Sequence, residues 1–183
     1  MVPTPPQSKI PSQSLVERTV ESPLGPLRLG ATADGLCLLE FDDPRRLDSA
    51  HRGLDRWLGL PCVPGRNAHI DLAASQLKAY FAGTLSTFTV PLVSPGTAFE
   101  TQVWTALRSI PCGATWSYGQ LATAIGNPRA HRAVGMANGR NRISILIPCH
   151  RVVNTGGSLG GYGGGLWRKD WLLKHEASSR RDS

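Results

Sequence analysis

The most informative stretch of the sequence is Ile147-Pro148-Cys149-His150-Arg151-Val152. The largely apolar run 143–147 predicts a short buried strand, so that Cys149 stands where a strand ends and a turn begins. Proline stiffens the backbone there, and the imidazole of His150 can help to ionise the thiol. A thiolate in such a setting is a nucleophile, although a free cysteine is most often a small buried hydrophobe. The motif therefore indicates chemistry only in combination with its surroundings.

The segments around this motif predict a mostly helical lobe. Apolar residues recur at three- and four-residue spacing over 99–110, which is typical of one helical face. Ser117 is a good N-cap for a short helix over 118–125, and a second short helix follows over 130–138. Two short helices joined by a glycine-containing turn in a basic region predict a helix-turn-helix. A last helix is predicted over 166–176.

Two segments of this lobe contain many small residues. The helix over 130–138 contains Ala133 and Gly135, which favour close approach to another surface: either a neighbouring helix or a nucleic-acid groove, with Arg132 projecting as a probe. The glycine-dense loop 156–165 carries one aromatic residue, Tyr162, and suits a flexible lid over a flat ring. This loop lacks the Gly-Lys-Ser/Thr of a P-loop, which argues against a phosphate cradle.

The first hundred residues predict a small α/β lobe. Strand patterns over 18–22, 27–32 and 35–41 predict an antiparallel meander, and a helix is predicted over 72–81. A polar, arginine-rich segment runs between them to about residue 56. Pro91 reduces the alternating run around it to an edge strand or a loop.

The predicted fold class is α+β, with a three-stranded antiparallel sheet and a helix in the N-terminal lobe. The domain boundaries that we expect are a disordered tail over 1–15, an N-terminal lobe over 16–94, a C-terminal lobe over 95–176 and a tail over 177–183.

The charge of the chain is one-sided. Its net charge is +7, but residues 1–100 contain nine Lys/Arg and ten Asp/Glu, whereas residues 101–183 contain eleven and three. A basic field confined to one half predicts a polyanionic partner, with nucleic acid first, while a merely solvated basic surface is the alternative.

The cysteines and the hydropathy bear on compartment and metal binding. The four cysteines are widely and irregularly spaced, with no Cys-x-x-Cys pair, so we expect reduced thiols, no disulfide and no metal. No apolar stretch is long enough to span a bilayer, and the start lacks the pattern of a secretory signal. We therefore expect a cytoplasmic protein in a reducing compartment, with no membrane association.

These motifs together resemble the O6-alkylguanine-DNA alkyltransferases. The resemblance is carried by Pro-Cys-His-Arg-Val at 148–152, Arg-Ala-Val-Gly-x-Ala at 132–137, Asn141, Gly-Tyr-Gly-Gly-Gly at 161–165 and Trp-Leu-Leu-x-His-Glu at 171–176. It covers residues 97–176 closely and the N-terminal lobe loosely.

The resemblance implies an α+β protein that repairs double-stranded DNA bearing O6-alkylguanine. The alkyl group, usually methyl, moves irreversibly to a cysteine in a single turnover, after minor-groove binding and nucleotide flipping. O4-methylthymine is a possible second substrate. No cofactor is implied, and a monomer is the default.

The resemblance also implies residue roles. Cys149 is the acceptor, His150 its base through a water molecule, Glu176 the group that orients the imidazole, and Asn141 the link between recognition helix and active-site turn. The nucleotide is flipped and the groove contacted by a set of residues on the two short helices: Tyr118, Arg132, Ala133, Gly135 and Met136. The substrate pocket is formed by Tyr118 together with Trp104, Val152, Tyr162 and Gly163.

Two departures from the family pattern lie close to this site. Arg142 follows Asn141 where the family often has proline, and Gly163 stands where some members have a serine that contacts the guanine. These departures bear on the hinge and on the range of alkyl groups that the pocket accepts.

Two other functions stay open at this point. One is a helix-turn-helix protein that binds undamaged DNA and whose cysteine is structural or a redox sensor. The other is a cysteine hydrolase built on Cys149, His150 and Glu176, which would turn over an ester or an amide beyond one equivalent.

Overall fold

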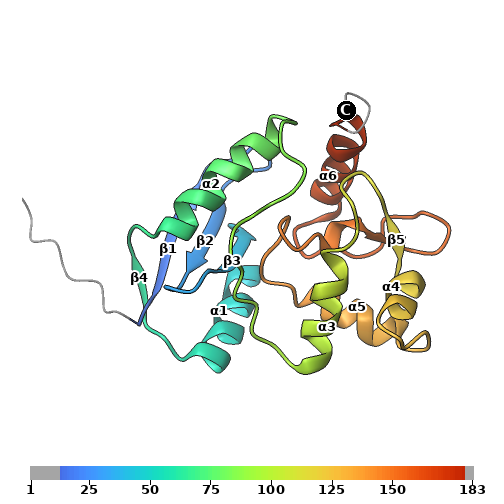
Figure 1. Ribbon diagram of the computed structural model, residues 1–183, viewed down its shortest axis with the longest axis horizontal. Coiled ribbons are helices and arrows are strands. Elements are labelled where there is room, and N and C mark those ends of the chain that lie inside the picture. The colour runs from blue at the N-terminus through green and yellow to red at the C-terminus, as the bar shows by residue number, and fades with distance from the viewer. Residues whose placement is uncertain (1–12, 180–183) are drawn as a thin grey trace, which may run out of the picture.

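The computed structural model describes residues 13–179 of the chain as two lobes that share one core. Figure 1 shows the N-terminal sheet with helix α2 (Ala68–Phe81) over it, and the C-terminal helices on the other side. The segment that carries Cys149 runs between the two lobes (Figure 1).

The predicted meander is confirmed by β1 (Leu15–Val20), β2 (Leu27–Ala31) and β3 (Leu36–Phe41), which pair antiparallel. A short strand that the sequence did not reveal, β4 (Cys62–Pro64), pairs parallel with β1, so the sheet has four strands in the order β3-β2-β1-β4. Strand β1 begins within the range expected to be a tail. The remaining tail residues, 1–12, lie outside the described part of the chain.

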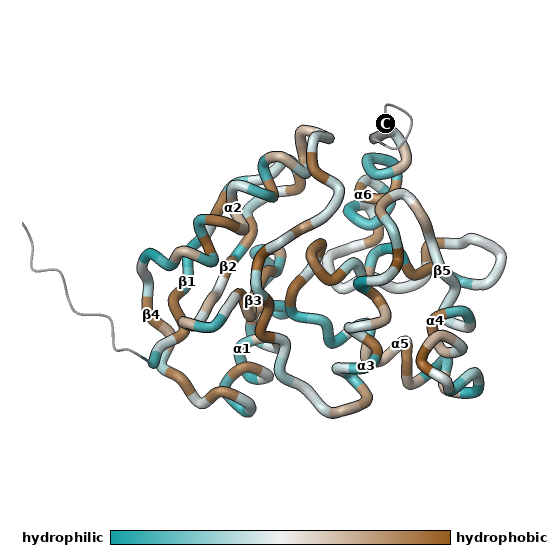
Figure 2. Tube along the Cα trace, viewed as in Figure 1, coloured by the Kyte–Doolittle hydropathy of each residue, from teal (hydrophilic) through white to brown (hydrophobic). Residues whose placement is uncertain are grey.

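Helix α1 (Pro44–Leu58) occupies the arginine-rich segment, for which no helix was predicted. The side chain of Asp43 caps its N-terminus, Pro44 starts it, and Gly59 ends it in the left-handed conformation with φ 58°. Its buried stripe is narrow because only Leu47, Ala50 and Leu54 face the core. Figure 2 shows how hydrophobic and hydrophilic residues alternate along it, which hides the apolar stripe. Helix α2 begins four residues earlier than predicted because Asn67 caps it.

The C-terminal lobe has the predicted helices α3 (Ala98–Leu107), α4 (Tyr118–Ala124), α5 (His131–Gly139) and α6 (Leu166–Ser179). Ser117 caps α4 as predicted, in a reciprocal pair of hydrogen bonds with Gln120. Two short strands, β5 (Trp116–Ser117) and β6 (Val152–Val153), pair parallel. Helix α6 continues into the segment expected to be a tail, and residues 180–183 lie outside the described range.

The apolar run 143–147 is buried, but it is not the strand that its pattern predicts. It folds into turns, with a single bridge from Ile143 to Leu39 on β3. Ile145 has φ 71°, a left-handed conformation that is costly for a β-branched residue. The turns place Cys149, two residues after the run, between the lobes, which a continuing strand would not do.

One hydrophobic cluster joins the lobes: Leu29 and Leu39 of the sheet belong to the same cluster as Val103 and Leu121 of the C-terminal helices. Within residues 13–179, no helix combines the length and the hydropathy needed to cross a bilayer.

Candidate active site

Cys149 begins a 3-10 turn, η1 (Cys149–Arg151), directly after Pro148, and only 5% of the residue is exposed. The turn carries His150 and Arg151 toward Glu176 on α6, although neighbouring side chains on a strand would point to opposite faces. The structure therefore brings Glu176 to the motif from 25 residues downstream.

Glu176 is fully buried and lies at the centre of a hydrogen-bond network. Its Oε1 accepts from His150 Nε2 at 2.9 Å and from the hydroxyl of Tyr80 on α2 at 2.8 Å. Arg151 donates through Nε to Oε2 at 2.8 Å and through Nη2 to Oε1 at 2.9 Å, and the backbone N–H of Gly113 donates at 3.1 Å. Burial alone would raise the pKa of this carboxyl, but the bonds from His150 and Arg151 outweigh burial and lower it. Glu176 is therefore a carboxylate.

His150 is fully buried, and burial lowers its pKa although the carboxylate of Glu176 opposes this shift. The imidazole is therefore neutral near pH 7. Its bond to Glu176 is consistent with the tautomer that has the proton on Nε2. Nδ1 has no hydrogen-bond partner among residues 13–179, and as the unprotonated nitrogen it can accept a proton.

The thiol of Cys149 is protonated in the free protein. Burial raises its pKa to about 11. Three groups act against burial: the Nδ2 of Asn141, 3.2 Å from Sγ, and the positive charges of Arg46 and Lys169. The site thus combines a thiol, a neutral imidazole and nearby cations that favour the thiolate once the proton has left.

Asn141 connects the end of α5 to the active-site turn. Its Nδ2 donates to the carbonyl oxygen of Ile147 at 2.8 Å, and its Oδ1 accepts from the backbone N–H of Ile143 at 3.0 Å. The same side chain reaches Cys149 Sγ. Asn141 closes the loop that holds Ile145 in its unfavourable conformation.

A cavity of about 220 Å³ opens beside Cys149. Its wall brings together four residues that the sequence analysis assigned to pocket or groove: Tyr118, Gly135, Tyr162 and Gly163. It also contains residues that the analysis missed: Arg46, Asn138, Gly139 and Gly161.

Two predicted pocket residues do not line this cavity. Trp104 is buried in the core, where its Nε1 donates to the carbonyl oxygen of Ala137 at 2.9 Å and so fastens α3 to α5. Val152 is fully buried, and its carbonyl oxygen accepts from Lys169 at 2.5 Å. Both contribute packing and hydrogen bonds outside the lining of this cavity, so the structure does not bring their side chains together with the other predicted pocket residues.

Arg46 is the main residue that sequence reasoning missed. It belongs to α1 of the N-terminal lobe, yet its guanidinium donates to the carbonyl oxygens of Gly139 at 3.0 Å and Asn141 at 3.2 Å. It also pairs with the buried carboxylate of Glu40. A Cβ on Gly163 would lie 2.4 Å from Arg46 Cζ, so glycine at 163 makes room for this arginine. The one sequence signal was the helix start at Asp43-Pro44.

Lys169 and Asn138 were also missed. Lys169 is fully buried on α6, and burial lowers its pKa to about 8 although Cys149 opposes this shift. Asn138 donates from Nδ2 to the carbonyl oxygen of Cys149 at 3.4 Å, while its buried Oδ1 has no partner among the described residues. A lysine at a helical core position gives no signal in a sequence without alignment, because most lysines are exposed.

The exposed face of α5 carries Arg132, Ala133 and Met136, and Met136 is 60% exposed. Gly135 lies on the side toward Tyr118, where a Cβ would be in ordinary contact at 3.7 Å. The small residues of α5 are thus divided between an exposed surface and the wall of the cavity.

The four cysteines are free thiols. Between residues 13 and 179, no three His, Cys, Asp or Glu side chains are grouped so that they could hold a metal ion.

Both lobes match family models. Residues 98–178 match the DNA binding domain of 6-O-methylguanine DNA methyltransferase, and residues 15–93 match its ribonuclease-like domain. Together these matches cover nearly all of the described chain.

Relatives match over almost their whole lengths. A methylated-DNA–protein-cysteine methyltransferase of Methanosarcina acetivorans is 44% identical over 158 residues, which are 86% of this chain and 96% of the relative. One of Mycobacterium tuberculosis is 46% identical over 165 residues, 88% and 92% of the two chains. A crystal structure of the M. tuberculosis OGT protein in complex with DNA has a TM-score of 0.76 at 44% identity and covers 90% of this chain and 94% of that one.

Proposed function

This chain belongs to the 6-O-methylguanine DNA methyltransferase family, and we propose that Cys149 is the residue on which it accepts the methyl group. Its activity is that of a methylated-DNA–protein-cysteine methyltransferase, which repairs O6-methylguanine in DNA by direct transfer to a cysteine. The observation that supports Cys149 most directly is that its buried thiol lines a cavity, while the adjacent His150 is hydrogen-bonded to the buried carboxylate of Glu176.

The first step is the loss of the thiol proton. The neutral His150 accepts it on Nδ1, through a water molecule, and the carboxylate of Glu176 stabilises the resulting imidazolium. Asn141 Nδ2 and the cation of Lys169 stabilise the thiolate that forms. A base is required because burial keeps the thiol protonated at neutral pH.

In the second step the sulfur of Cys149 attacks the methyl carbon in line with the guanine O6. An S–C bond forms, the C–O6 bond breaks, and its electron pair stays on the guanine, which takes up a proton. The half-buried hydroxyl of Tyr118 lines the cavity and is placed to assist this protonation. The product is a thioether, and no group in the site is arranged to cleave it, so each molecule acts once.

The target atom is stacked inside the duplex, so the nucleotide must turn outward, at a cost of roughly a few kcal/mol. Helix α5 enters the minor groove with Arg132, Ala133 and Met136, and Arg132 fills the space that the nucleotide leaves. Tyr162 and Gly163 form the wall against which the guanine ring lies. The protein does this as a monomer, without a cofactor, in the reducing cytoplasm, in keeping with its free thiols.

The test is the intact mass of the protein after incubation with excess duplex oligonucleotide containing one O6-methylguanine. We expect a gain of one methyl group per chain, confined by peptide mapping to the Cys149 peptide. Cys149→Ala should gain nothing, whereas Cys62→Ser, which removes an exposed thiol, should react like the wild type. Transfer by Cys149→Ala would overturn the assignment, and turnover of an ester beyond one equivalent would indicate a hydrolase.

A further inference from the structure

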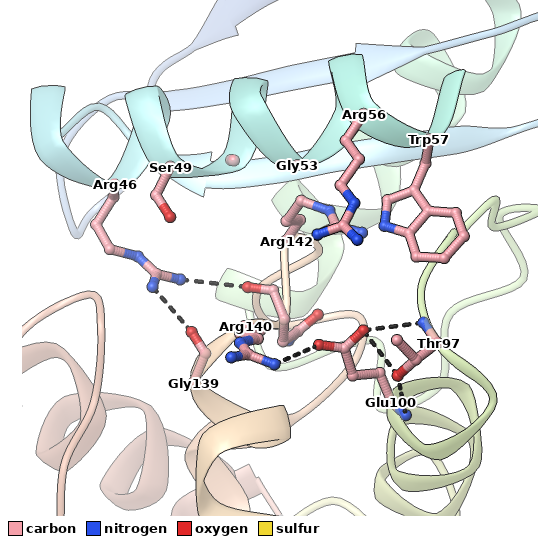
Figure 3. Close-up of a pocket in the computed structure, with 12 residues that line it drawn as sticks. Arg46, Ser49, Gly53, Arg56, Trp57, Thr97, Glu100, Gly139, Arg140 and Arg142 are labelled. Carbon is pink, nitrogen blue, oxygen red and sulfur yellow. Dashed lines mark hydrogen bonds and ion pairs between the residues drawn. The ribbon is translucent and has the colours of Figure 1, made fainter. Parts of the chain in front are cut away.

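A second hollow, distinct from the cavity beside Cys149, lies between the lobes and has a volume of about 320 Å³. Figure 3 shows α1 along one wall, with Arg46, Arg56 and Trp57 directed into the hollow. The opposite wall carries Arg140 and Arg142 from the segment after α5, with Thr97 and Glu100 at the start of α3 (Figure 3). Four guanidinium groups from two lobes thus face one space; we call it the inter-lobe cleft.

The side of α1 that faces the cleft is selectively basic. Arg46, Gly53 and Arg56 follow one another at spacings of seven and three residues, which place them on one helical face. The acidic residues of α1, Asp48 and Asp55, do not line the cleft. The positive charge on this wall is therefore not neutralised by its own helix.

Only two of the four arginines have carboxylate partners within the described chain. Arg46 pairs with Glu40, and Arg140 pairs with Glu100 at 3.0 Å. Glu100 is also engaged by the N-terminal cap of α3, where its Oε2 accepts from the backbone N–H of Thr97 at 2.9 Å. Among residues 13–179, neither Arg56 nor Arg142 forms an ion pair. The cleft therefore carries an excess of positive charge, although the carboxylate of Glu100 also acts on Arg142 at longer range.

Arg142 is fixed in the cleft. Its Nη2 donates to the carbonyl oxygen of Pro95, and its Cζ lies 5.4 Å from the centre of the Trp104 ring. A Cβ on Gly53 would lie only 2.7 Å from Arg142 Nη1, so the glycine lets α1 approach the guanidinium. Burial lowers the pKa of Arg142, which shows that its charge is poorly solvated. A fixed, desolvated cation beside further cations is stabilised by an anion.

We propose that the inter-lobe cleft is a binding site for a phosphate-type oxyanion, held between Arg56 and Arg142. The planar forks of two guanidinium groups match the paired oxygens of a phosphate, and such charge-assisted bonds are the strong ones. The exposed indole of Trp57, 43% accessible, stands at the same wall and suits a flat group attached to the phosphate. The site does not depend on the alkyl-transfer chemistry.

Two sources could supply this oxyanion. The cleft shares Arg46 and Gly139 with the cavity beside Cys149, so one source is a backbone phosphate of a DNA strand bound at that cavity. A free phosphate compound offers the same chemistry. One measurement tests whether the cleft binds phosphate, and a second distinguishes DNA from a free phosphate compound.

The first arm measures thermal unfolding of the full chain in increasing inorganic phosphate, against sodium chloride of equal ionic strength. An anion bound only by the folded state raises the melting temperature. Arg56→Gln removes one fork at an exposed position, and Arg52→Gln removes the same charge from α1 outside the cleft. In Arg56→Gln we expect that about tenfold more phosphate is needed for the same rise in melting temperature, because the substitution breaks a charge-assisted contact. In Arg52→Gln the phosphate dependence should be unchanged.

The second arm measures binding to unmodified duplex DNA as a function of salt. If a backbone phosphate occupies the cleft, the slope of log K against log salt becomes shallower by about 0.9 in Arg56→Gln and stays constant in Arg52→Gln. Equal slopes, together with a weakened phosphate effect in Arg56→Gln, identify a free phosphate compound as the occupant. If the two variants behave alike in both arms, the proposal is overturned.

Discussion

Glu176 in the C-terminal lobe and Glu40 in the N-terminal lobe are both fully buried, but their pKa values shift in opposite directions. Glu176 accepts from His150, from Tyr80, from a backbone N–H and twice from Arg151, and the bonds from His150 and Arg151 lower its pKa against the effect of burial. Glu40 accepts hydrogen bonds from Arg46, from the hydroxyl of Ser144 at 3.0 Å and from the backbone N–H of Phe41. Burial nevertheless raises its pKa.

The difference shows how each lobe serves the site. The C-terminal carboxylate is fully ionised because its own lobe and Tyr80 supply enough donors, so it can hold a proton-accepting histidine in place. The N-terminal carboxylate has fewer donors and serves to anchor Arg46, which extends across the lobe boundary to the cavity. In the proposed mechanism the proton transfer takes place beside Glu176, and Glu40 contributes by holding Arg46.

The largest effect is expected from Glu176→Gln. An amide cannot stabilise the imidazolium of His150, and it leaves the buried Arg151 without a counter-charge. We expect the single-turnover rate of methyl transfer to fall by up to about 10⁴-fold, by analogy with the loss of the orienting carboxylate in a catalytic triad. Stability should fall by about 3–5 kcal/mol in urea unfolding, as for other broken buried pairs.

The matched control is Glu21→Gln, which removes a carboxylate from an exposed position. It should change neither rate nor stability measurably. A Glu176→Gln protein that folds and transfers the methyl group at the wild-type rate would show that His150 does not need this carboxylate.

A smaller effect is expected from Glu40→Gln. Arg46 would lose its charged partner but keep its bonds to the carbonyl oxygens of Gly139 and Asn141. Because burial raises the pKa of Glu40, its ionised form already costs stability at pH 7, so the neutral amide should change the free energy of unfolding by no more than about 1.5 kcal/mol. Arg46 favours the thiolate of Cys149 whereas the charge of Glu40 opposes it, so the rate of transfer should change by less than about tenfold, measured in single turnover at pH 7. An effect as large as that of Glu176→Gln would remove the contrast between the two carboxylates.

The dependence of stability on pH should separate the two carboxylates by sign. The folded pKa of Glu176 lies below the ordinary value of 4.5, so below pH 4.5 the unfolded chain binds more protons, and stability is lost as the pH falls. The folded pKa of Glu40 lies above 4.5, so its burial costs stability as the pH rises above that value. Urea unfolding from acid to neutral pH should show a weaker acid loss in Glu176→Gln. In Glu40→Gln the loss on raising the pH should be smaller. Identical profiles in both variants would contradict the assignment.

The same contrast explains what could be predicted from sequence. The C-terminal lobe was predictable because each feature had a local signal: the apolar spacing of α3, the Ser117 cap of α4 and the resemblance around Cys149. Its family pattern also pointed to Glu176, which local periodicity would not have linked to the motif. The run before Cys149 was wrongly predicted as a strand, because an apolar run indicates that a segment is buried but does not determine its backbone conformation. Ile145 adopts a left-handed conformation that is rare for a β-branched residue.

The N-terminal contribution could not be predicted, for a physical reason. Helix α1 has a narrow apolar stripe among arginines, so its pattern resembles a polar loop. Arg46 lines the cavity only because the two lobes pack against each other, and no local property of the sequence encodes that packing. Trp104 and Val152 were assigned to the pocket from the family resemblance, whereas both residues are buried in the core.

The smallest predicted effect concerns the glycine that accommodates Arg46. A Cβ at Gly163 would lie 2.4 Å from Arg46 Cζ, so Gly163→Ala must displace the guanidinium. The flexible arginine can move, and we expect a loss of no more than about 1 kcal/mol, typical of a relieved overpacking contact. The rate of transfer should hardly change, because Arg46 keeps both its charge and its Glu40 partner. Gly161→Ala is the matched control: it lines the same cavity, but its Cβ would meet nothing within 4 Å. Stopped-flow transfer and urea unfolding of both variants decide the point. If the alanine at 161 slowed transfer as much as the alanine at 163, the effect would come from loss of cavity space, and Arg46 would have no part in it.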